Sequence, residues 1–246
     1  MMKKTFFALA FSALLAACGG GGSSSPPAAP SSAQGLWVGT TTTNRTATAL
    51  VLSDGSYYVL YSAVNNPAVI GGVVQGSSTA TAGALASGDA KDFNLEGAGV
   101  VPATLAGTYT TKQSLGATVT YPAGAPTTFT STYDPSYETV PTLATIAGTY
   151  SGTVAFSLGS QAASVTVSTG GEVTGSANGC SLAGLAKPRA DANAYDVSIT
   201  FGPAPCYFAG QTFAGIGYFN ATTKRLYAAA PNAARTDGVL FVGTKP

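Results

Sequence analysis

The sequence predicts an all-β protein: two tandem small antiparallel β-barrel or β-sandwich units that follow a disordered tether. Three observations support this fold class. Apolar and polar residues alternate with a period of two in several short runs, turn signals rich in Gly, Asp and Asn separate the runs, and no convincing helix follows residue 34. A period of two places one face of a strand in a core and the other face in water.

The first 17 residues have the pattern of a cleavable export signal. Lys3 and Lys4 form a positive start, and the apolar run TFFALAFSALL follows from Thr5 to Leu15. This run is about half of the ~20 residues that a membrane-spanning helix needs. We therefore leave residues 1–17 out of the fold.

The residues LAAC that end at Cys18 resemble the lipobox of bacterial lipoproteins. The resemblance implies cleavage before Cys18, a diacylglycerol on its thiol and an acyl chain such as palmitate on its amine. Two or three acyl chains anchor a protein more firmly than one. Gly19, rather than an aspartate, implies the outer membrane, without saying whether the protein faces the periplasm or the outside. The alternative is an ordinary signal peptide in which Cys18 is incidental.

Residues 18–34 continue from this cysteine as a tract of Gly, Ser, Pro and Ala. Gly and Ser make a chain flexible, Pro prevents regular pairing, and the tract has no large side chain to start a core. We interpret it as the tether between lipid and fold, so the expected partner at this end is the membrane.

Composition excludes several classes of function. Cleavage would remove two of the eleven basic residues and leave nine against ten acidic ones, with no Lys/Arg cluster, so no nucleic-acid partner is expected. The chain has no histidine, which removes Ser-His-Asp and Cys-His catalysis and histidine metal sites. No phosphate-binding or dinucleotide motif is present. We assign no catalytic residue, metal or cofactor and expect no enzyme; a hydrolase with a carboxylate pair is the remaining catalytic alternative.

Cys180 and Cys206 are the two cysteines that remain beyond Cys18. In an exported chain an even pair predicts a disulfide, and closing a loop of about 25 residues would stabilise the fold by roughly 3 kcal/mol. Two free buried thiols are the alternative.

The run from Tyr57 to Tyr61 is apolar on both faces, unlike the other strands. Alternating strands with one buried face are expected at residues 117–121, 164–168 and 196–201. A strand that is apolar on both faces is typically covered twice. We therefore expect residues 57–61 to be covered on both sides or to border the second unit.

Turn signals divide these strands. Asp54-Gly55 is the strongest and predicts a type I′ hairpin, because both residues tolerate positive φ. Gly170-Gly171 and residues 220–223 predict two further turns. The one short helical candidate, Ala228 to Arg235, is interrupted by Pro231.

Internal similarity places the unit boundaries. A G-x-[WY]-x-G pattern begins at Gly35 and again at Gly148, and the segments ATLAGTY and ATIAGTY are each expected to open a strand. We predict a first unit at 35–138 and a second at 139–246. One continuous barrel is the alternative, since Thr-rich strands can be alike through composition alone.

Two segments resemble known β-barrel families. The G-x-W opening resembles the first strand of lipocalins and other calycins, which implies that Trp37 closes one end of a barrel. The segment from Ala228 to Lys245 resembles the last hairpin of transferrin-binding-protein-B-like surface lipoproteins. The residues that match are Asn232, Ala233, Ala234, Gly238, Phe241, Gly243 and Lys245.

Four aromatic residues are the candidates for contact with a ligand. They are Trp37, Tyr57, Tyr58 and Tyr61. Rigid aromatic side chains give large contact areas, although barrel closure and sheet packing would use them equally well. The acids Asp89, Asp92 and Glu96 are spaced unlike a calcium loop, so we place them in a solvated loop.

These observations favour a membrane-anchored lipoprotein of the cell envelope that serves as a non-catalytic ligand-binding or adhesion module. Its expected partner is an unidentified protein or small molecule. The alternatives are a structural or assembly partner of an outer-membrane complex and the carboxylate-dependent hydrolase.

Overall fold

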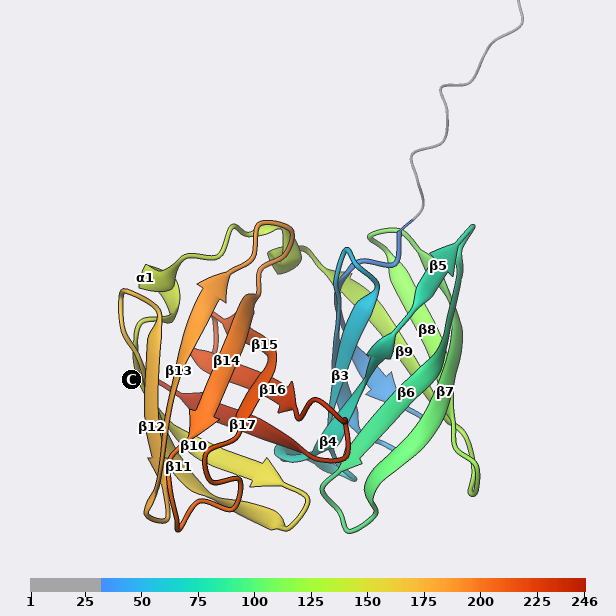
Figure 1. Cartoon of the computed structure of the whole chain (residues 1–246). Coiled ribbons are helices and arrows are strands. Elements are labelled where there is room, and N and C mark those ends of the chain that lie inside the picture. Colours follow the sequence, from blue (N-terminus) through green and yellow to red (C-terminus); the bar gives the residue numbers. More distant parts are fainter. Residues whose placement is uncertain (1–31) are drawn as a thin grey trace, which may run out of the picture. The chain divides into compact units, whose positions relative to one another are not determined.

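The computed structural model describes residues 32–246, which form two closed barrels of eight antiparallel strands each (Figure 1). The all-β class predicted from the sequence is confirmed. The predicted signal peptide, the predicted lipidation site at Cys18 and most of the predicted tether lie outside the described residues.

The first barrel is a continuous antiparallel meander that closes on itself through two long-range pairings. β1 pairs with β9, and β4 pairs with β6, while the short β5 (Thr79–Thr81) extends only the β6 edge. Its barrel strands are β1 (Gly35–Thr41), β2 (Thr46–Val51), β3 (Ser56–Ala63), β4 (Asn66–Ser77), β6 (Ala84–Asn94), β7 (Gly99–Thr110), β8 (Ser114–Thr120) and β9 (Thr127–Asp134).

The second barrel is a simple up-and-down ring in which each strand pairs with the next and β17 pairs back with β10. Full closure leaves no free sheet edge. Its strands are β10 (Gly148–Phe156), β11 (Gly159–Val167), β12 (Glu172–Ala177), β13 (Cys180–Pro188), β14 (Tyr195–Phe201), β15 (Thr212–Asn220), β16 (Arg225–Pro231) and β17 (Gly238–Thr244).

Two short helices join the barrels in sequence: the 3₁₀ helix η1 (Pro135–Glu138) and α1 (Leu143–Ile146). The Asp134 carboxylate accepts a hydrogen bond from Ser136 N at 2.9 Å, and the Thr142 hydroxyl accepts one from Thr145 N at 3.2 Å. These N-caps satisfy amide groups that a helix start leaves unpaired.

The Asp54-Gly55 hairpin joins β2 to β3 as predicted, but the predicted turn type is wrong. Gly55 has a φ of 84°, whereas Asp54 is not among the residues with positive φ, and a type I′ turn needs both. Gly55 N donates to Leu52 O at 3.1 Å and Leu52 N donates to Ser56 O at 2.9 Å. The loop is therefore longer than the two residues of a type I′ turn, and Gly55, its last residue, takes the positive φ.

The structure also decides two smaller points raised by the sequence. The short helical candidate at 228–235 is the end of strand β16 followed by a turn. The two similar heptapeptides do not occupy equivalent places: ATLAGTY lies inside β7, whereas ATIAGTY begins in α1 and ends in β10. Their likeness is one of composition.

The G-x-[WY]-x-G pattern, in contrast, has the same role in both barrels. Trp37 and Tyr150 are fully buried, and each donates a hydrogen bond to the carbonyl oxygen four residues earlier. Trp37 Nε1 lies 3.0 Å from Ala33 O, and Tyr150 Oη lies 2.6 Å from Ile146 O. Each aromatic ring thus fixes the segment that precedes the first strand of its barrel.

The last glycine of the pattern is required by close strand pairing. A Cβ atom at Gly39 would lie 1.8 Å from Thr130 O, and one at Gly152 would lie 2.0 Å from Val242 O. No side chain fits there without moving the neighbouring last strand. The first strand of each barrel therefore closes against the last one through a glycine.

Strand β3 is apolar on both faces because both faces are covered. Tyr57, Val59 and Tyr61 pack in the core of the first barrel. Tyr58 and Leu60 pack instead against residues of the second barrel, among them Leu240. The expected double cover of residues 57–61 is observed.

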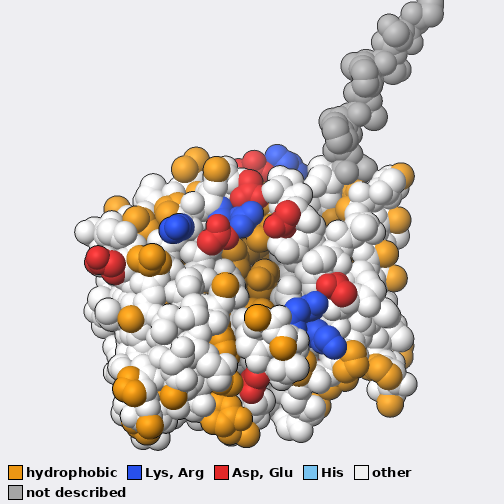
Figure 2. All heavy atoms as spheres, viewed as in Figure 1, with side chains coloured by type: hydrophobic (Ala, Val, Ile, Leu, Met, Phe, Trp, Pro, Cys, Tyr) orange, Lys and Arg blue, Asp and Glu red, His pale blue; other side chains and the backbone are white. Residues whose placement is uncertain are grey.

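An arginine adds polar contacts to this apolar contact region. Arg235, in the β16–β17 turn, donates to the Asp89 carboxylate at 3.0 Å and to the carbonyl oxygens of Gln75 and Asp89 at 2.8 Å. Elsewhere charge is sparse: Figure 2 shows a face on which a few charged side chains stand among hydrophobic and uncharged ones.

Candidate functional site

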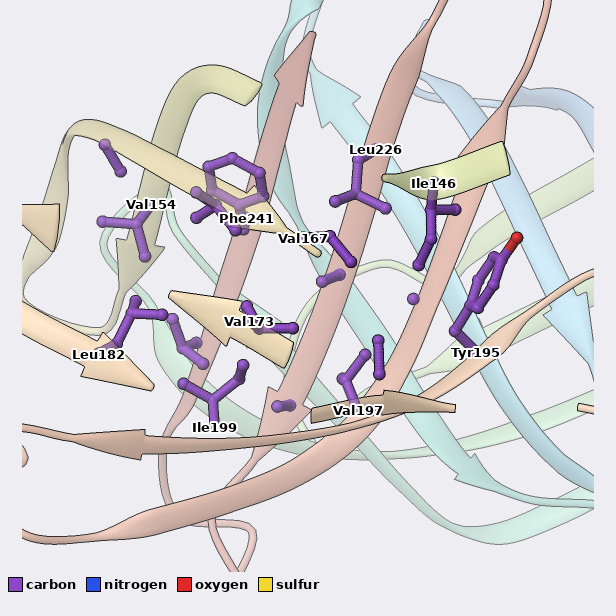
Figure 3. Close-up of a pocket in the computed structure, with 17 residues that line it drawn as sticks. Ile146, Val154, Val167, Val173, Leu182, Tyr195, Val197, Ile199, Leu226 and Phe241 are labelled. Atoms are coloured by element: carbon purple, nitrogen blue, oxygen red, sulfur yellow. The ribbon is translucent and has the colours of Figure 1, made fainter. Parts of the chain in front are cut away.

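The interior of the second barrel is a packed apolar core. Its cavity has a volume of about 70 Å³ and is lined almost entirely by aliphatic and aromatic side chains that point inward from the strands (Figure 3). The Tyr195 hydroxyl is satisfied by donation to Thr142 O at 3.0 Å. An apolar cavity of ~150 Å³ stays dry and admits benzene. At half that size, this interior has little room for a ligand.

The first barrel holds a larger and more polar cavity of about 310 Å³, which we call the cup. It lies at the barrel end formed by the β1–β2, β6–β7 and β8–β9 connections. The exposed residues Thr43, Ala98 and Ala123 form its rim. The cup is lined by Thr41, Thr43, Arg45, Ala47, Val59, Tyr61, Val74, Asp92, Asn94, Ala98, Val101, Val119, Tyr121, Ala123, Thr127 and Phe129.

Asp92 is the central polar group of the cup. It lies on β6, is only 4% exposed, and is one of four polar or charged residues buried among the described ones. Tyr61 Oη donates to Oδ1 at 2.6 Å, and Tyr121 Oη donates to Oδ2 at 2.8 Å. Each oxygen of the buried carboxylate therefore has a hydroxyl donor, as a buried charge requires.

Asn94 extends this network towards the rim. Its side-chain amide donates to Tyr61 Oη at 3.2 Å, and its side-chain oxygen accepts from the backbone N–H groups of Glu96 and Ala98 at 2.9 and 3.2 Å. Asn94 thereby orders the β6–β7 loop and fixes the Tyr61 hydroxyl as a donor to Asp92.

Arg45 ties three rim segments together. Its Nη2 lies 2.6 Å from the Glu96 carboxylate, its Nη1 donates to Ser62 O at 2.8 Å, and its guanidinium lies 5.2 Å from the centre of the Tyr61 ring. The β1–β2 loop, the end of β3 and the β6–β7 loop meet at this one side chain.

Burial controls the protonation of the network. It raises the pKa of Asp92 above its ordinary value, against the opposing effects of the two tyrosine hydroxyls and Arg45. Burial, together with the nearby Asp92 charge, also raises the pKa values of Tyr61 and Tyr121. Both tyrosines therefore keep their protons at neutral pH and act as donors.

The structure brings one of the four aromatic candidates into the cup. Tyr61 contributes its ring and hydroxyl. Trp37 is buried at the start of β1, Tyr57 donates to the Ser87 hydroxyl at 3.0 Å within the barrel core, and Tyr58 lies on the outer face of β3.

Asp92 could not be recognised as a site residue from the sequence, because its strand carries an inverted pattern of polar and apolar residues. The predicted solvated loop is wrong for Asp89 and Asp92, which lie in β6, while Glu96 lies in the β6–β7 turn. A register shift follows Ser87, and beyond it Asp92 faces the interior while Phe93 faces outward against the second barrel. An apolar Phe93 next to an aspartate normally indicates the opposite orientation.

The predicted disulfide between Cys180 and Cys206 is confirmed, with an S–S distance of 2.02 Å. It joins the start of β13 to the connection between β14 and β15. Within residues 32–246 there is no group of three or more His, Cys, Asp or Glu side chains arranged to hold a metal ion.

No helix among the described residues has the length and apolar character needed to cross a membrane.

Comparison with known proteins gives distant structural neighbours only. No family model and no curated protein matches the chain. Transferrin binding protein B (isotype 1) of serogroup B Neisseria meningitidis is similar at 10% identity and a TM-score of 0.31, over 83% of this chain and 59% of that one. A variant of the vaccine antigen transferrin binding protein B of Haemophilus parasuis is similar at 8% identity and a TM-score of 0.29, over 81% and 65%.

A third neighbour, a protein of unknown function from the DUF3598 family of Nostoc punctiforme, is similar at 9% identity and a TM-score of 0.29, over 87% of this chain and 96% of that one. The present chain spans less than two thirds of either transferrin binding protein B chain.

Proposed function

We propose that this protein is a lipid-anchored binding protein of the outer membrane that holds a small molecule in the cup of its first barrel without transforming it. The observation that carries the proposal is the cup itself. Ligand sites are typically concave, mostly apolar and a few hundred Å³ in volume, with a small number of well-placed polar groups. The cup has this size and composition, and Asp92 with its two tyrosines provides the polar groups.

The rim contacts support binding by a preformed site. Arg45, Asn94 and Glu96 already hold the loops around the cup through side-chain hydrogen bonds and an ion pair. A site that is ordered before the ligand arrives loses less conformational entropy on binding. The cup is therefore suited to capture, and the second barrel, with its packed apolar interior, to support.

Binding in the cup is tested by filling it. Val101 lies on β7 directly opposite Asp92 across the β6–β7 pair and lines the cup. In a screen of charged and neutral metabolites by ligand-observed NMR, wild-type protein is expected to bind at least one compound, and Val101→Phe is expected to lose that binding by at least tenfold. Val38→Phe, the same change at a position 44% exposed on β1, is the control and keeps it. Binding unchanged in Val101→Phe, or no binder at all, would contradict the proposal.

The anchor is tested at Cys18. We expect Cys18→Ala to abolish lipid attachment, because alanine has no thiol for the diacylglycerol. The protein should then move from the membrane fraction to the soluble fraction, and its mass should show an unmodified chain. Membrane association with an unchanged mass in Cys18→Ala would show that the lipobox interpretation is wrong.

A further inference from the structure

We infer that the cup is selective for an organic ammonium cation, a primary amine with a short apolar body, whose charged nitrogen binds Asp92. The inference rests on the proposed function, because it names the class of ligand that the cup takes.

The balance of charge in the cup favours a cation. Three charged side chains lie in or at the cup: Asp92, Arg45 and Glu96. Arg45 is committed to Glu96 at 2.6 Å and to Ser62 O at 2.8 Å, so these two charges offset each other at the rim. The remaining charge is that of the Asp92 carboxylate. An anionic ligand would place like charges together in a poorly solvated space, whereas a cation would offset the charge of Asp92.

The Asp92 carboxylate can accept further hydrogen bonds. An ionised carboxylate has about four acceptor positions, and the two tyrosine hydroxyls occupy one on each oxygen of Asp92. The neighbouring groups are already engaged, since Tyr61 Oη accepts from Asn94 and the Asn94 oxygen accepts from two backbone amides. Asp92 is thus the charged acceptor with free capacity in this network, next to the neutral hydroxyl oxygen of Tyr121. A primary ammonium group brings three N–H donors.

The walls of the cup suit a small apolar body. Beside the polar network, the cup is lined by Ala47, Val59, Val74, Val119 and Phe129. Hydrocarbon groups gain from burial against such side chains. The rings of Tyr61 and Tyr121 also lie within the site, and aromatic faces attract cations. A positive head with a small apolar body fits both parts of the lining.

The experiment compares three probes of similar size that differ in charge: phenethylamine, 2-phenylethanol and 3-phenylpropanoate. At pH 7.5, by isothermal titration calorimetry, we expect phenethylamine to bind wild-type protein at least tenfold more tightly than the other two. Asp92→Asn keeps the shape of the side chain and removes its charge. It is expected to weaken phenethylamine binding at least tenfold, while Val38→Phe, on the outer surface, leaves it unchanged.

A pH titration of the wild-type protein provides a test that does not depend on the folding of Asp92→Asn. The amine stays protonated from pH 4 to 8, since amines of this kind titrate near 10. The groups that face Asp92 are Tyr61 on β3, Tyr121 beyond β8, Arg45 before β2 and Glu96 after β6. Because burial raises the pKa of Asp92, its carboxylate takes up a proton at a higher pH than an exposed aspartate does, and the affinity for phenethylamine should fall as the pH falls through that pKa.

The outcomes separate the inference from the proposed function. Equal or tighter binding of 2-phenylethanol or 3-phenylpropanoate, with loss in Val101→Phe, would overturn the ammonium class while leaving the cup as a binding site. Phenethylamine binding that survives Asp92→Asn, or that does not change with pH, would also overturn it. Absence of phenethylamine binding overturns the inference, and the metabolite screen then decides the proposed function separately.

Discussion

Replacement of Trp37 by alanine is expected to lower the free energy of unfolding by about 3–5 kcal/mol. Trp37 has no exposed surface, its indole N–H donates to Ala33 O at 3.0 Å, and its ring packs edge-on against Tyr133 at 5.4 Å between centroids. Alanine would leave a cavity at the start of β1, remove the ring contact and leave the buried carbonyl of Ala33 without this donor.

The effect is measured by chemical denaturation followed by far-UV circular dichroism, because Trp37 is the single tryptophan and its fluorescence is lost in the variant. Val38→Ala is the matched control. Val38 is the next residue on β1 and is 44% exposed, so its truncation should change the free energy of unfolding by less than about 1 kcal/mol. Equal effects at the two positions would show that Trp37 does not close the barrel.

Tyr150, the counterpart of Trp37 in the second barrel, shows how much of this aromatic contact at the start of a barrel could be predicted from the sequence. The G-x-[WY]-x-G pattern identified Gly35 and Gly148 as the starts of two similar units, and both begin the first strand of a barrel. The ring acts within one short segment, because its hydrogen bond reaches back four residues, and this part can be predicted from the sequence. The glycine acts differently, because it meets the last strand of the barrel, which lies far along the chain.

Asp92 shows what could not be predicted. Its orientation depends on a register shift within β6 and on the cover that the second barrel gives to Phe93. Both are tertiary features, and they reverse the usual meaning of an alternating pattern. Asp92 lies on β6, whereas its partner Tyr121 lies in the β8–β9 loop and the rim residue Arg45 in the β1–β2 loop. Only closure of the barrel brings the three together.

The similarity of the two heptapeptides did not predict equivalent structures, for a related reason. ATLAGTY and ATIAGTY have nearly the same local preferences, yet every residue of Ala103–Tyr109 pairs with β6, with β8 or with both. The other copy follows the Thr142 N-cap, which starts a helical turn before β10. The two copies thus differ in the contacts that residues outside the repeat supply.

Removal of the disulfide in the double variant Cys180→Ser/Cys206→Ser is expected to lower the free energy of unfolding by about 3 kcal/mol. The bond closes a loop with a sequence separation of 26, and loops of this length restrict the unfolded chain by that amount in the chain-entropy model. The loss should be seen as a lower denaturant midpoint. Added reductant should leave the midpoint of the double variant unchanged. It should lower the midpoint of the wild-type protein to the same value.

The position of the disulfide adds side-chain packing to its effect on the entropy of the unfolded chain. Cys206 is buried in the β14–β15 connection, two residues before Phe208, whose ring lies 5.5 Å from that of Phe201 and 4.7 Å from that of Phe213. The disulfide therefore holds an aromatic cluster against the second barrel. If reductant left the wild-type midpoint unchanged, neither the entropic nor the packing contribution would be present. A thiol reagent that labelled both cysteines in the unreduced, denatured protein would show that the bond does not form.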